Sequence, residues 1–380
     1  MHLTRRGFLM AAAAISVTSA RSAAAPLRAA VIGHTGRGNY GHGLAEIFQD
    51  RSEITLVGLA DPVASGRETM ARSLGVSRVY ADWREMLTQE RPDLVSVAMR
   101  HADQHAEVAL ACVEAGAHCY VEKPFVRFPS EADAVLAAAN RHGRRIAVAH
   151  TMRMSPAVRR LRQIVSEGRI GELREMHAFG KQDERAGGED LMVLGPHLFD
   201  LMRLFAGDPL WVSARVQVQS RELAVTDRRK VKDEVGWVAG DRVNAQFAFG
   251  NGVLGLYTSD GRLRESTGQW GIEFRGSRGS ARINCDLVPV ACVKTASAWK
   301  DGTRREDWAP LEGVSLMAAA DHNRAPVGDW LEAIASGREP ECSGRNGAWG
   351  VEMVMGIYQS ALGGSRVTFP LRERGHPLVP

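Results

Sequence analysis

A glycine-rich segment near the start of the chain has the residue types needed to bind a phosphate group. Residues 33–41 read Gly-His-Thr-Gly-Arg-Gly-Asn-Tyr-Gly and directly follow a short apolar run. Glycine lets the backbone turn tightly and approach a pyrophosphate, which then lies at a helix N-terminus. Two registers fit a dinucleotide-binding turn: Gly33, Thr35 and Gly38, or Gly36, Gly38 and Gly41. The candidate cofactor contacts here are Gly33, Thr35, Gly36, Arg37 and Gly38.

An acidic residue occupies the place expected for a ribose contact. Asp61 ends a second apolar run and lies 20 residues beyond Gly41, where a carboxylate accepts hydrogen bonds from ribose hydroxyls. Alone, Asp61-Pro62 would fit an ordinary turn equally well, and the glycine-rich segment is what favours a cofactor. The carboxylate would repel a 2′-phosphate, so we expect NAD rather than NADP, although Arg67 would soften that preference.

Two side chains have the chemistry to move a hydroxyl proton. Lys123 lies in Glu122-Lys123-Pro124 after an apolar run, and His197 lies in the segment Gly-Pro-His-Leu-Phe-Asp at 195–200. Hydride transfer to or from a secondary alcohol needs a group that takes or gives the hydroxyl proton. We expect Lys123 to hydrogen-bond the reacting oxygen, and a histidine such as His197 has the chemistry to take the proton. A buried structural histidine is the competing interpretation of His197.

The elements that must position these residues alternate regularly in the first half of the chain. Strand-like runs are predicted at 27–32, 54–60, 79–80, 94–98, 118–121 and 146–149. Helices are predicted from residue 44 onward, and at 64–74, 82–89, 105–115 and 130–142. This alternation predicts an α/β domain with a doubly wound parallel sheet, a Rossmann domain over residues 26–150.

The pattern changes after about residue 205. Strands are predicted at 211–218, 243–249, 253–257, 272–274, 280–283 and 288–294, with a tight hairpin turn at 249–252. The charged stretch 221–234 indicates a solvated loop or strand edge, and two helices are predicted near 325–335 and 347–361. We expect a second, α+β domain over residues 151–380 with an open, largely antiparallel sheet. The last two helices of this domain are candidates to pack back on the Rossmann domain.

Several segments together resemble the glucose–fructose oxidoreductase/inositol dehydrogenase (Gfo/Idh/MocA) family. They are Glu122-Lys123-Pro124, residues 109–116, Arg153-Met154-Ser155-Pro156, residues 168–172 and residues 337–340. The resemblance covers essentially the whole chain after the first 25 residues. It implies a Rossmann domain, an open antiparallel sheet that mediates homo-oligomer contacts, and sugar, cyclitol or related polyol substrates. It also places Glu122, Lys123 and Pro124 at the cofactor. Residues 195–200 resemble the family's active-site helix, which implies that His197 is the acid or base.

The chain departs from the family pattern at two places. Many members have aspartate four residues before the histidine, where this chain has Val193. If one helix ran from 190 to 204, Asp190 would share a face with His197 and could orient a substrate hydroxyl; the alternative is a simple helix N-terminal acid. Arg100-His101 replaces the usual threonine-proline pair beside the cofactor. The further candidates for substrate contacts are Arg153, Glu189 and Asp200, with His150 a weaker one.

The N-terminus predicts export. An arginine pair at 5–6 precedes an apolar run at 9–17 and small residues at 23–25, the layout of a twin-arginine signal over residues 1–25. We therefore expect a periplasmic or other extracytoplasmic location. The apolar run is shorter than the roughly 20 residues that span a bilayer, and no later run is long enough, so we expect no membrane insertion.

Charge and cysteine content exclude some partners and sites. The formal net charge is +4, and Arg5, Arg6 and Arg21 supply three of those charges, which leaves the exported chain near neutral. No basic block suggests nucleic acid or anionic membrane as a partner. The 5 cysteines form no metal-binding spacing, so we expect no metal and interpret them as buried apolar side chains. A disulfide is an open alternative in an oxidising compartment.

Three functions fit these residues. The first is a sugar or polyol dehydrogenase, and the second is a lyase or glycosidase that oxidises C3 transiently and then returns the hydride. Both use Lys123 and His197. The third is a sugar-binding protein with a vestigial Rossmann domain. An exported enzyme cannot rely on cytoplasmic cofactor recycling, which favours tightly held NAD and redox-neutral turnover.

Overall fold

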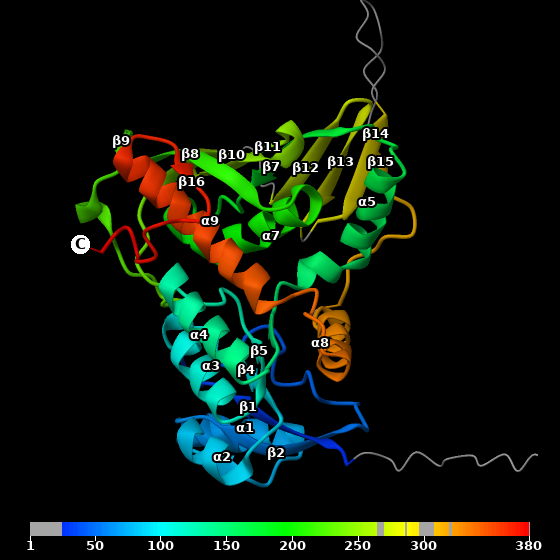
Figure 1. Ribbon diagram of the computed structural model, residues 1–380, viewed down its shortest axis with the longest axis vertical. Helices are drawn as coiled ribbons and strands as arrows, with labels where there is room; N and C mark the ends of the chain where they lie inside the picture. The colour runs from blue at the N-terminus through cyan, green and yellow to red at the C-terminus, as the bar shows by residue number, and fades with distance from the viewer. Residues whose placement is uncertain (1–24, 264–269, 286, 296–307, 319–320, 380) are drawn as a thin grey trace, which may run out of the picture.

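The chain folds around two sheets that lie at opposite ends of the molecule (Figure 1). The computed structural model describes residues 25–263, 270–285, 287–295, 308–318 and 321–379. The predicted export signal lies outside the described residues except for residue 25. Within the described part, none of the helices has the length and apolar composition needed to cross a membrane.

The first sheet is parallel and has six strands in the order β3-β2-β1-β4-β5-β6. Its strands are β1 (Leu27–Ile32), β2 (Ile54–Ala60), β3 (Val79–Tyr80), β4 (Leu94–Val97), β5 (His118–Val121) and β6 (Ile146–Val148). Its helices are α1 (Ala64–Leu74), α2 (Trp83–Glu90), α3 (His105–Glu114) and α4 (Pro129–Arg141). The strand order reverses between β1 and β4, and ligands of such sheets bind at the carboxyl ends of the strands there.

One predicted element of this domain is wrong. The helix expected from residue 44 is absent, because residues 41–50 form successive turns. Gly41, Gly43 and Asp50 all have positive φ, which an α-helix does not allow. The helical spacing of Leu44 and Phe48 is satisfied instead by burial of both side chains against the Rossmann core.

The second sheet has ten strands and is antiparallel except for the pairing of β7 with β11. The path runs β15-β14-β13-β12-β7-β11-β10-β8-β16, and β9 pairs with β8. The sequence reading missed β7, whose buried Met176 and Ala178 alternate with partly exposed neighbours. The strands are β7 (Leu173–Phe179), β8 (Pro209–Val218), β9 (Arg221–Glu222), β10 (Arg242–Phe249), β11 (Leu254–Asp260), β12 (Gly271–Gly276), β13 (Gly279–Asn284), β14 (Ala291–Thr295), β15 (Ala309–Pro310) and β16 (Val367–Thr368). The predicted fold class is confirmed.

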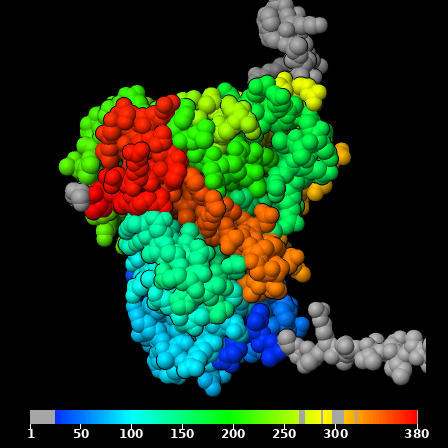
Figure 2. Space-filling view, viewed as in Figure 1, coloured from blue at the N-terminus to red at the C-terminus, as the bar shows by residue number. Residues whose placement is uncertain are grey.

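The C-terminal helices join the two parts of the molecule. Helix α8 (Arg324–Ser336) contacts β6, and α9 (Gly344–Gly363) contacts both α4 and β8. Figure 2 shows this orange segment crossing from the Rossmann end to the other sheet. Trp330 of α8 is fully buried, with its ring 6.5 Å from that of Phe48 and 5.7 Å from that of Tyr120. The Rossmann core is therefore completed by a residue from the far end of the chain.

The remaining α-helices are α5 (Pro156–Ser166), α6 (Gly188–Val193) and α7 (Gly195–Ala206). Figure 1 shows α5 and α7 beside the second sheet, and α6 contacts β10. No single helix runs from 190 to 204, because Leu194 separates α6 from α7, so the condition for Asp190 to share a helix face with His197 is not met. Pro196 has no N–H to donate to a preceding turn, so a helix cannot continue through it unbroken. All five cysteines are buried and none of the five forms a disulfide, which confirms their interpretation as apolar side chains.

Acid sensitivity should follow from His118 at the start of β5. Its Nδ1 accepts a hydrogen bond of 2.8 Å from the Arg145 amide, and burial, with the charges of Arg144 and Arg145, lowers the pKa of His118 to about 4. Unfolding therefore takes up a proton between pH 6.5 and about 4. The free energy of unfolding should fall in that window as pH falls, by about 1.4 kcal/mol per pH unit for this group.

Urea unfolding of the wild type and of His118→Gln, measured from pH 7 to 4.5, tests this. Glutamine keeps an acceptor for the Arg145 amide but has no proton to gain. The variant should show a pH slope shallower by the contribution of one proton. Identical slopes would contradict the assignment.

Candidate active site

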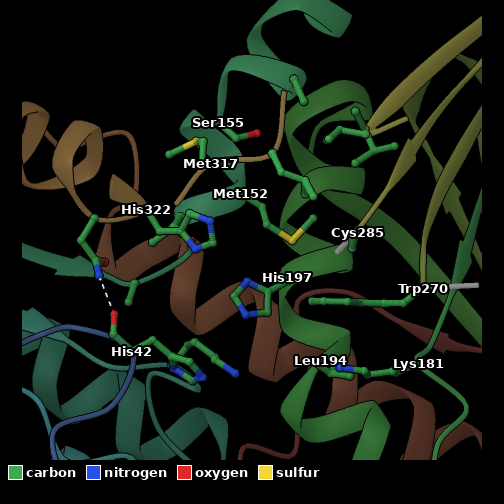
Figure 3. Close-up of a pocket in the computed structure, with 18 of the residues that line it drawn as sticks. His42, Met152, Ser155, Lys181, Leu194, His197, Trp270, Cys285, Met317 and His322 are labelled. Atoms are coloured by element: carbon green, nitrogen blue, oxygen red, sulfur yellow. Dashed lines mark hydrogen bonds between the residues drawn. The ribbon is translucent and has the colours of Figure 1, made fainter. Parts of the chain in front are cut away.

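A cavity of about 310 Å³ lies where the carboxyl end of β5 meets the second sheet. Figure 3 shows its lining side chains, which come from parts of the chain far apart in sequence. The Rossmann domain supplies Glu122 and Lys123, the α6–α7 junction supplies His197, and the second sheet region supplies Trp270. The segment before α8 adds residues 315–317 and 322–323. The two residues selected for proton transfer, Lys123 and His197, thus face one cavity.

Lys123 is fixed by the break between α6 and α7. Its Nζ donates to the Val193 carbonyl oxygen over 3.3 Å, and the side chain is buried. Burial lowers the pKa of Lys123, while the Glu122 carboxylate opposes that shift. Val193 stands where the family has aspartate, so here the lysine is held by a main-chain acceptor. A lysine with a depressed pKa exchanges its proton more readily near neutral pH.

Glu122 connects Lys123 to the glycine-rich segment. Its carboxylate accepts bonds from the His42 amide at 3.3 Å, from the His42 Nδ1 at 3.1 Å and from the Lys123 amide at 3.1 Å. Burial would raise the pKa of Glu122, but the bonds from His42 outweigh it and hold the pKa below its usual value. Gly41 packs so closely that a Cβ there would lie 2.5 Å from the carboxylate.

His197 projects from α7 into the cavity (Figure 3). Burial, followed by the charge of Lys123, lowers the pKa of His197 well below its ordinary value. The imidazole is therefore neutral at physiological pH and able to accept a proton. Its ring centroid lies 5.5 Å from that of His150, which is buried and does not line the cavity.

Asp190 and Glu189 are placed away from the cavity lining of the described residues. The Asp190 carboxylate accepts bonds from the Ser259 hydroxyl at 2.6 Å and from the amides of Lys181 at 3.2 Å and Gln182 at 3.4 Å. Glu189 pairs with Arg229 at 3.3 Å. Asp190 shares no helix with His197, because Asp190 belongs to α6 and His197 to α7. Its bonds to the Lys181 and Gln182 amides instead hold the backbone at Lys181, whose side chain lines the cavity.

Arg153 and Asp200 are likewise not among the described residues that line the cavity. The Arg153 Nε is 3.3 Å from the Asp200 Oδ2, and both residues are buried. Burial raises the pKa of Asp200 to about 6, although Arg153 acts against that rise. The geometry brings this pair next to His150 and not into contact with the cavity space.

Asp61 is bonded to the glycine-rich segment itself. Its Oδ2 accepts the Thr35 amide at 3.0 Å, the Thr35 hydroxyl at 2.6 Å and the Tyr40 hydroxyl at 2.8 Å. The Tyr40 ring lies on Gly33, where a Cβ would approach it to 2.1 Å. The Oδ1 atom accepts only the Val63 amide, at 2.9 Å, among the bonds found in the described residues.

The other glycine-segment residues have distinct surroundings. Gly38 packs against Arg100, so that a Cβ there would come within 2.4 Å of the arginine Cβ. Gly36 has φ +82° and faces open space. Arg37 pairs with Asp103 at 2.8 Å.

These residues fit a nicotinamide dinucleotide. The open backbone at Gly36 follows β1, Asp61 follows β2, and Lys123 follows β5 beside the cavity. Along the sheet order β2-β1-β4-β5, the ribose end, the pyrophosphate and the nicotinamide of such a cofactor follow one another at the carboxyl edge. Asp61 would exchange part of its bonding to Tyr40 and Thr35 for the ribose.

Two family models match the chain. Residues 27–150 match the model described as the oxidoreductase family with an NAD-binding Rossmann fold, and residues 158–282 match the GFO/IDH/MocA C-terminal domain. Together these two domains of one family account for most of the chain. This chain belongs to the GFO/IDH/MocA family. Its first domain is therefore an NAD-binding Rossmann domain, and the protein is an oxidoreductase of that family.

Known members are similar over much of their length. A D-apiose dehydrogenase of Paraburkholderia graminis is 24% identical over 87% of this chain and 88% of that protein. A D-glucoside 3-dehydrogenase of Escherichia coli is 29% identical over 48% of this chain and 55% of that protein. A solved levoglucosan dehydrogenase, in complex with NADH and levoglucosan, has a TM-score of 0.72 at 23% identity, covering 91% of this chain and 100% of that one. This last likeness shows a shared fold.

Sequence reasoning missed several residues that line the cavity. His42 continues the glycine-rich segment as Gly41-His42-Gly43, and that spacing was the available signal. Trp270 and Lys181 come from the second domain, where the Lys181 Nζ lies 5.7 Å from the centroid of the Trp270 ring. Asn323 reaches the site because its amide donates to the His42 carbonyl at 2.9 Å (Figure 3). No local sequence pattern predicts contacts between residues as far apart in the chain as His42 and Asn323.

The bonding of Asp61 predicts opposite effects of two substitutions on NAD binding. Tyr40→Phe frees Asp61 from the phenol and should tighten NAD binding by roughly tenfold or more, because a hydrogen bond to a charged group contributes about 1.5–3 kcal/mol. Asp61→Ala should weaken NAD binding by about 1–3 kcal/mol, and should weaken NADP binding less or improve it. Isothermal titration calorimetry of protein stripped of dinucleotide measures both. Tighter binding of NADP than of NAD by the unmodified protein would show that Asp61 has been assigned wrongly.

Proposed function

We propose that this protein is an NAD-dependent oxidoreductase acting on a secondary hydroxyl of a sugar, glycoside or cyclitol. The observation that carries the proposal is that Lys123 and His197 face one cavity at the carboxyl edge of an NAD-binding sheet. The names of the similar dehydrogenases, which refer to apiose, a glucoside and levoglucosan, support a carbohydrate substrate.

Proton transfer is assigned to two groups with different positions. Bound NAD supplies the hydride acceptor. Lys123, held by the Val193 carbonyl, donates a hydrogen bond to the reacting oxygen and so orients it. The neutral His197 imidazole takes the hydroxyl proton, since its low pKa leaves a lone pair free at physiological pH.

The remaining cavity wall suits a polyhydroxylated ring. Trp270, Met152, Leu194 and Met317 provide apolar surface for the C–H faces of a sugar, and Lys181 provides a donor for its hydroxyls. Burial of that apolar surface favours binding in proportion to the area removed from water.

We further propose NAD in preference to NADP, export by the twin-arginine route and homo-oligomerisation through the second sheet.

A redox-neutral lyase or glycosidase is the second candidate. The arginine pair at 5–6 favours it, because an exported enzyme would lose a freely exchanging cofactor. The similarity to a D-glucoside 3-dehydrogenase, which covers about half of each chain, supports chemistry at C3. Both candidates need the same hydroxyl oxidation and therefore the same two residues.

Lys123→Met should reduce kcat by roughly 10²–10⁴-fold, the usual loss for an acid–base group, and leave NAD binding largely unchanged. His197→Ala should act similarly, and Asp190→Asn should have a smaller effect. Turnover and NAD affinity are measured on the same preparations. Lys230→Met, which removes a lysine placed beside Trp237 outside the cavity lining, is the matched control and should keep full activity. Near-normal turnover of Lys123→Met would overturn the mechanism.

Redox balance separates the two candidates. Protein washed free of added NAD is supplied with a glycoside or a pair of sugars, and product and reduced-cofactor absorbance are followed together. Many turnovers without net absorbance change are expected for redox-neutral catalysis. Activity that stops after one equivalent and resumes on addition of NAD would identify an ordinary dehydrogenase.

A further inference from the structure

Unpartnered polar atoms are concentrated behind His197. Both ring nitrogens of His150, the Nδ1 of His197 and the Oδ1 of Asp200 are buried without a hydrogen-bond partner among the described residues. Buried polar groups are nearly always hydrogen-bonded, and each one left unpaired costs about 1–3 kcal/mol. Several such atoms in one place indicate a role other than stability, because an apolar cluster would fold at lower cost.

The three side chains form a row that leads away from the cavity. His150 follows β6, and its ring centroid lies 5.5 Å from that of His197, with an angle of 54° between the ring planes. On its other side, the His150 Nδ1 is 3.9 Å from the Asp200 Oδ1. His197 and Asp200 are three residues apart on α7, a spacing that puts them on one helix face.

Asp200 has one oxygen engaged and one available. Its Oδ2 is 3.3 Å from the Arg153 Nε, which accounts for a structural ion pair. Its Oδ1 is the carboxylate oxygen that lies 3.9 Å from the His150 Nδ1. The ion pair with Arg153 therefore accounts for the Oδ2 of Asp200 only. The Oδ1 faces the imidazole of His150, which is buried with it.

We propose that His150 and Asp200 form, with His197, a buried relay that holds the proton of the substrate hydroxyl for as long as the hydride is on the nicotinamide. The proton passes from the hydroxyl to the Nε2 of His197, whose Nδ1 proton passes to one nitrogen of His150. The proton on the other His150 nitrogen passes to the Asp200 Oδ1. One O–H bond breaks at the substrate and one forms at Asp200, and both imidazoles end neutral.

This inference rests on the proposed hydroxyl oxidation. The relay needs the 3.9 Å separation to shorten by a small turn of the His150 ring, as catalytic hydrogen bonds commonly tighten only when substrate is bound. Among the described residues the row ends at a carboxylate that is 1% exposed, which suits storage and return of a proton and not release to solvent.

The surrounding charges are consistent with that direction. Burial, with the charges of Arg153 and Lys123, lowers the pKa of His150 to about 3, so neither histidine keeps an extra proton. Asp200, with a pKa raised to about 6, is the better acceptor. The groups that face the relay are Arg153, Arg203, Glu341, Cys342, Lys123, Glu122 and His42.

The test is a single turnover of NAD-loaded enzyme in weak buffer, with a pH-indicator dye and nicotinamide absorbance recorded together. In the wild type at pH 7, reduced nicotinamide should form before the proton reaches the medium. The oxidation rate should fall as pH drops below about 6, because a protonated Asp200 accepts nothing. Asp200→Asn should lose that pH dependence and slow hydride transfer roughly 10–100-fold, with NAD affinity unchanged.

His150→Gln is the second variant and should show the same loss if Asp200→Asn does not fold. Prompt proton release by the wild type, in step with hydride transfer, would overturn the relay and leave the proposed function intact. Unchanged pH profiles in both variants would do the same. Absence of hydride transfer with every sugar tested would overturn the proposed function and the relay with it.

Discussion

The hydrogen bond from Lys123 to the Val193 carbonyl is the contact on which the site depends. The last carbonyls of any helix lack partners within that helix, and they carry partial negative charge. The break at Leu194 makes Val193 the last residue of α6 and leaves its carbonyl free for the lysine ammonium. The same break starts α7 afresh, and so directs His197 into the cavity. One interruption of a helix therefore positions both residues assigned to proton transfer.

The sequence predicted the fold well where one physical pattern acts alone. Continuous apolar runs such as β4 and β5 are buried on both faces, and their position and type follow directly from composition. The failed helix from residue 44 shows the limit of such patterns. Its apolar spacing was real, but the positive-φ glycines around it and the partner Trp330 of α8, which lies far along the chain, decide the outcome.

The structure brings Lys123 and His197 to one cavity and gives other residues singled out from the sequence contacts that the sequence did not indicate. Asp61 was selected for a ribose, yet the structure bonds it to Tyr40 and Thr35. Asp200 was selected for substrate, yet it lies beside Arg153 and His150. Residue type and strand position single out candidate groups. Their partners come from other elements, and one sequence without its fold does not specify which of several donors reaches a given carboxylate.

The burial of Trp330 in the Rossmann core has a consequence for synthesis of the chain. The first 150 residues contain all six strands of the parallel sheet, yet one face of their core needs a side chain encoded some 180 residues later. At roughly 5–20 residues per second, a ribosome takes about 10–40 s to cover that distance. During that interval Phe48 lacks the side chain that covers it in the folded protein, so completion of the Rossmann core waits until most of the second domain has been made.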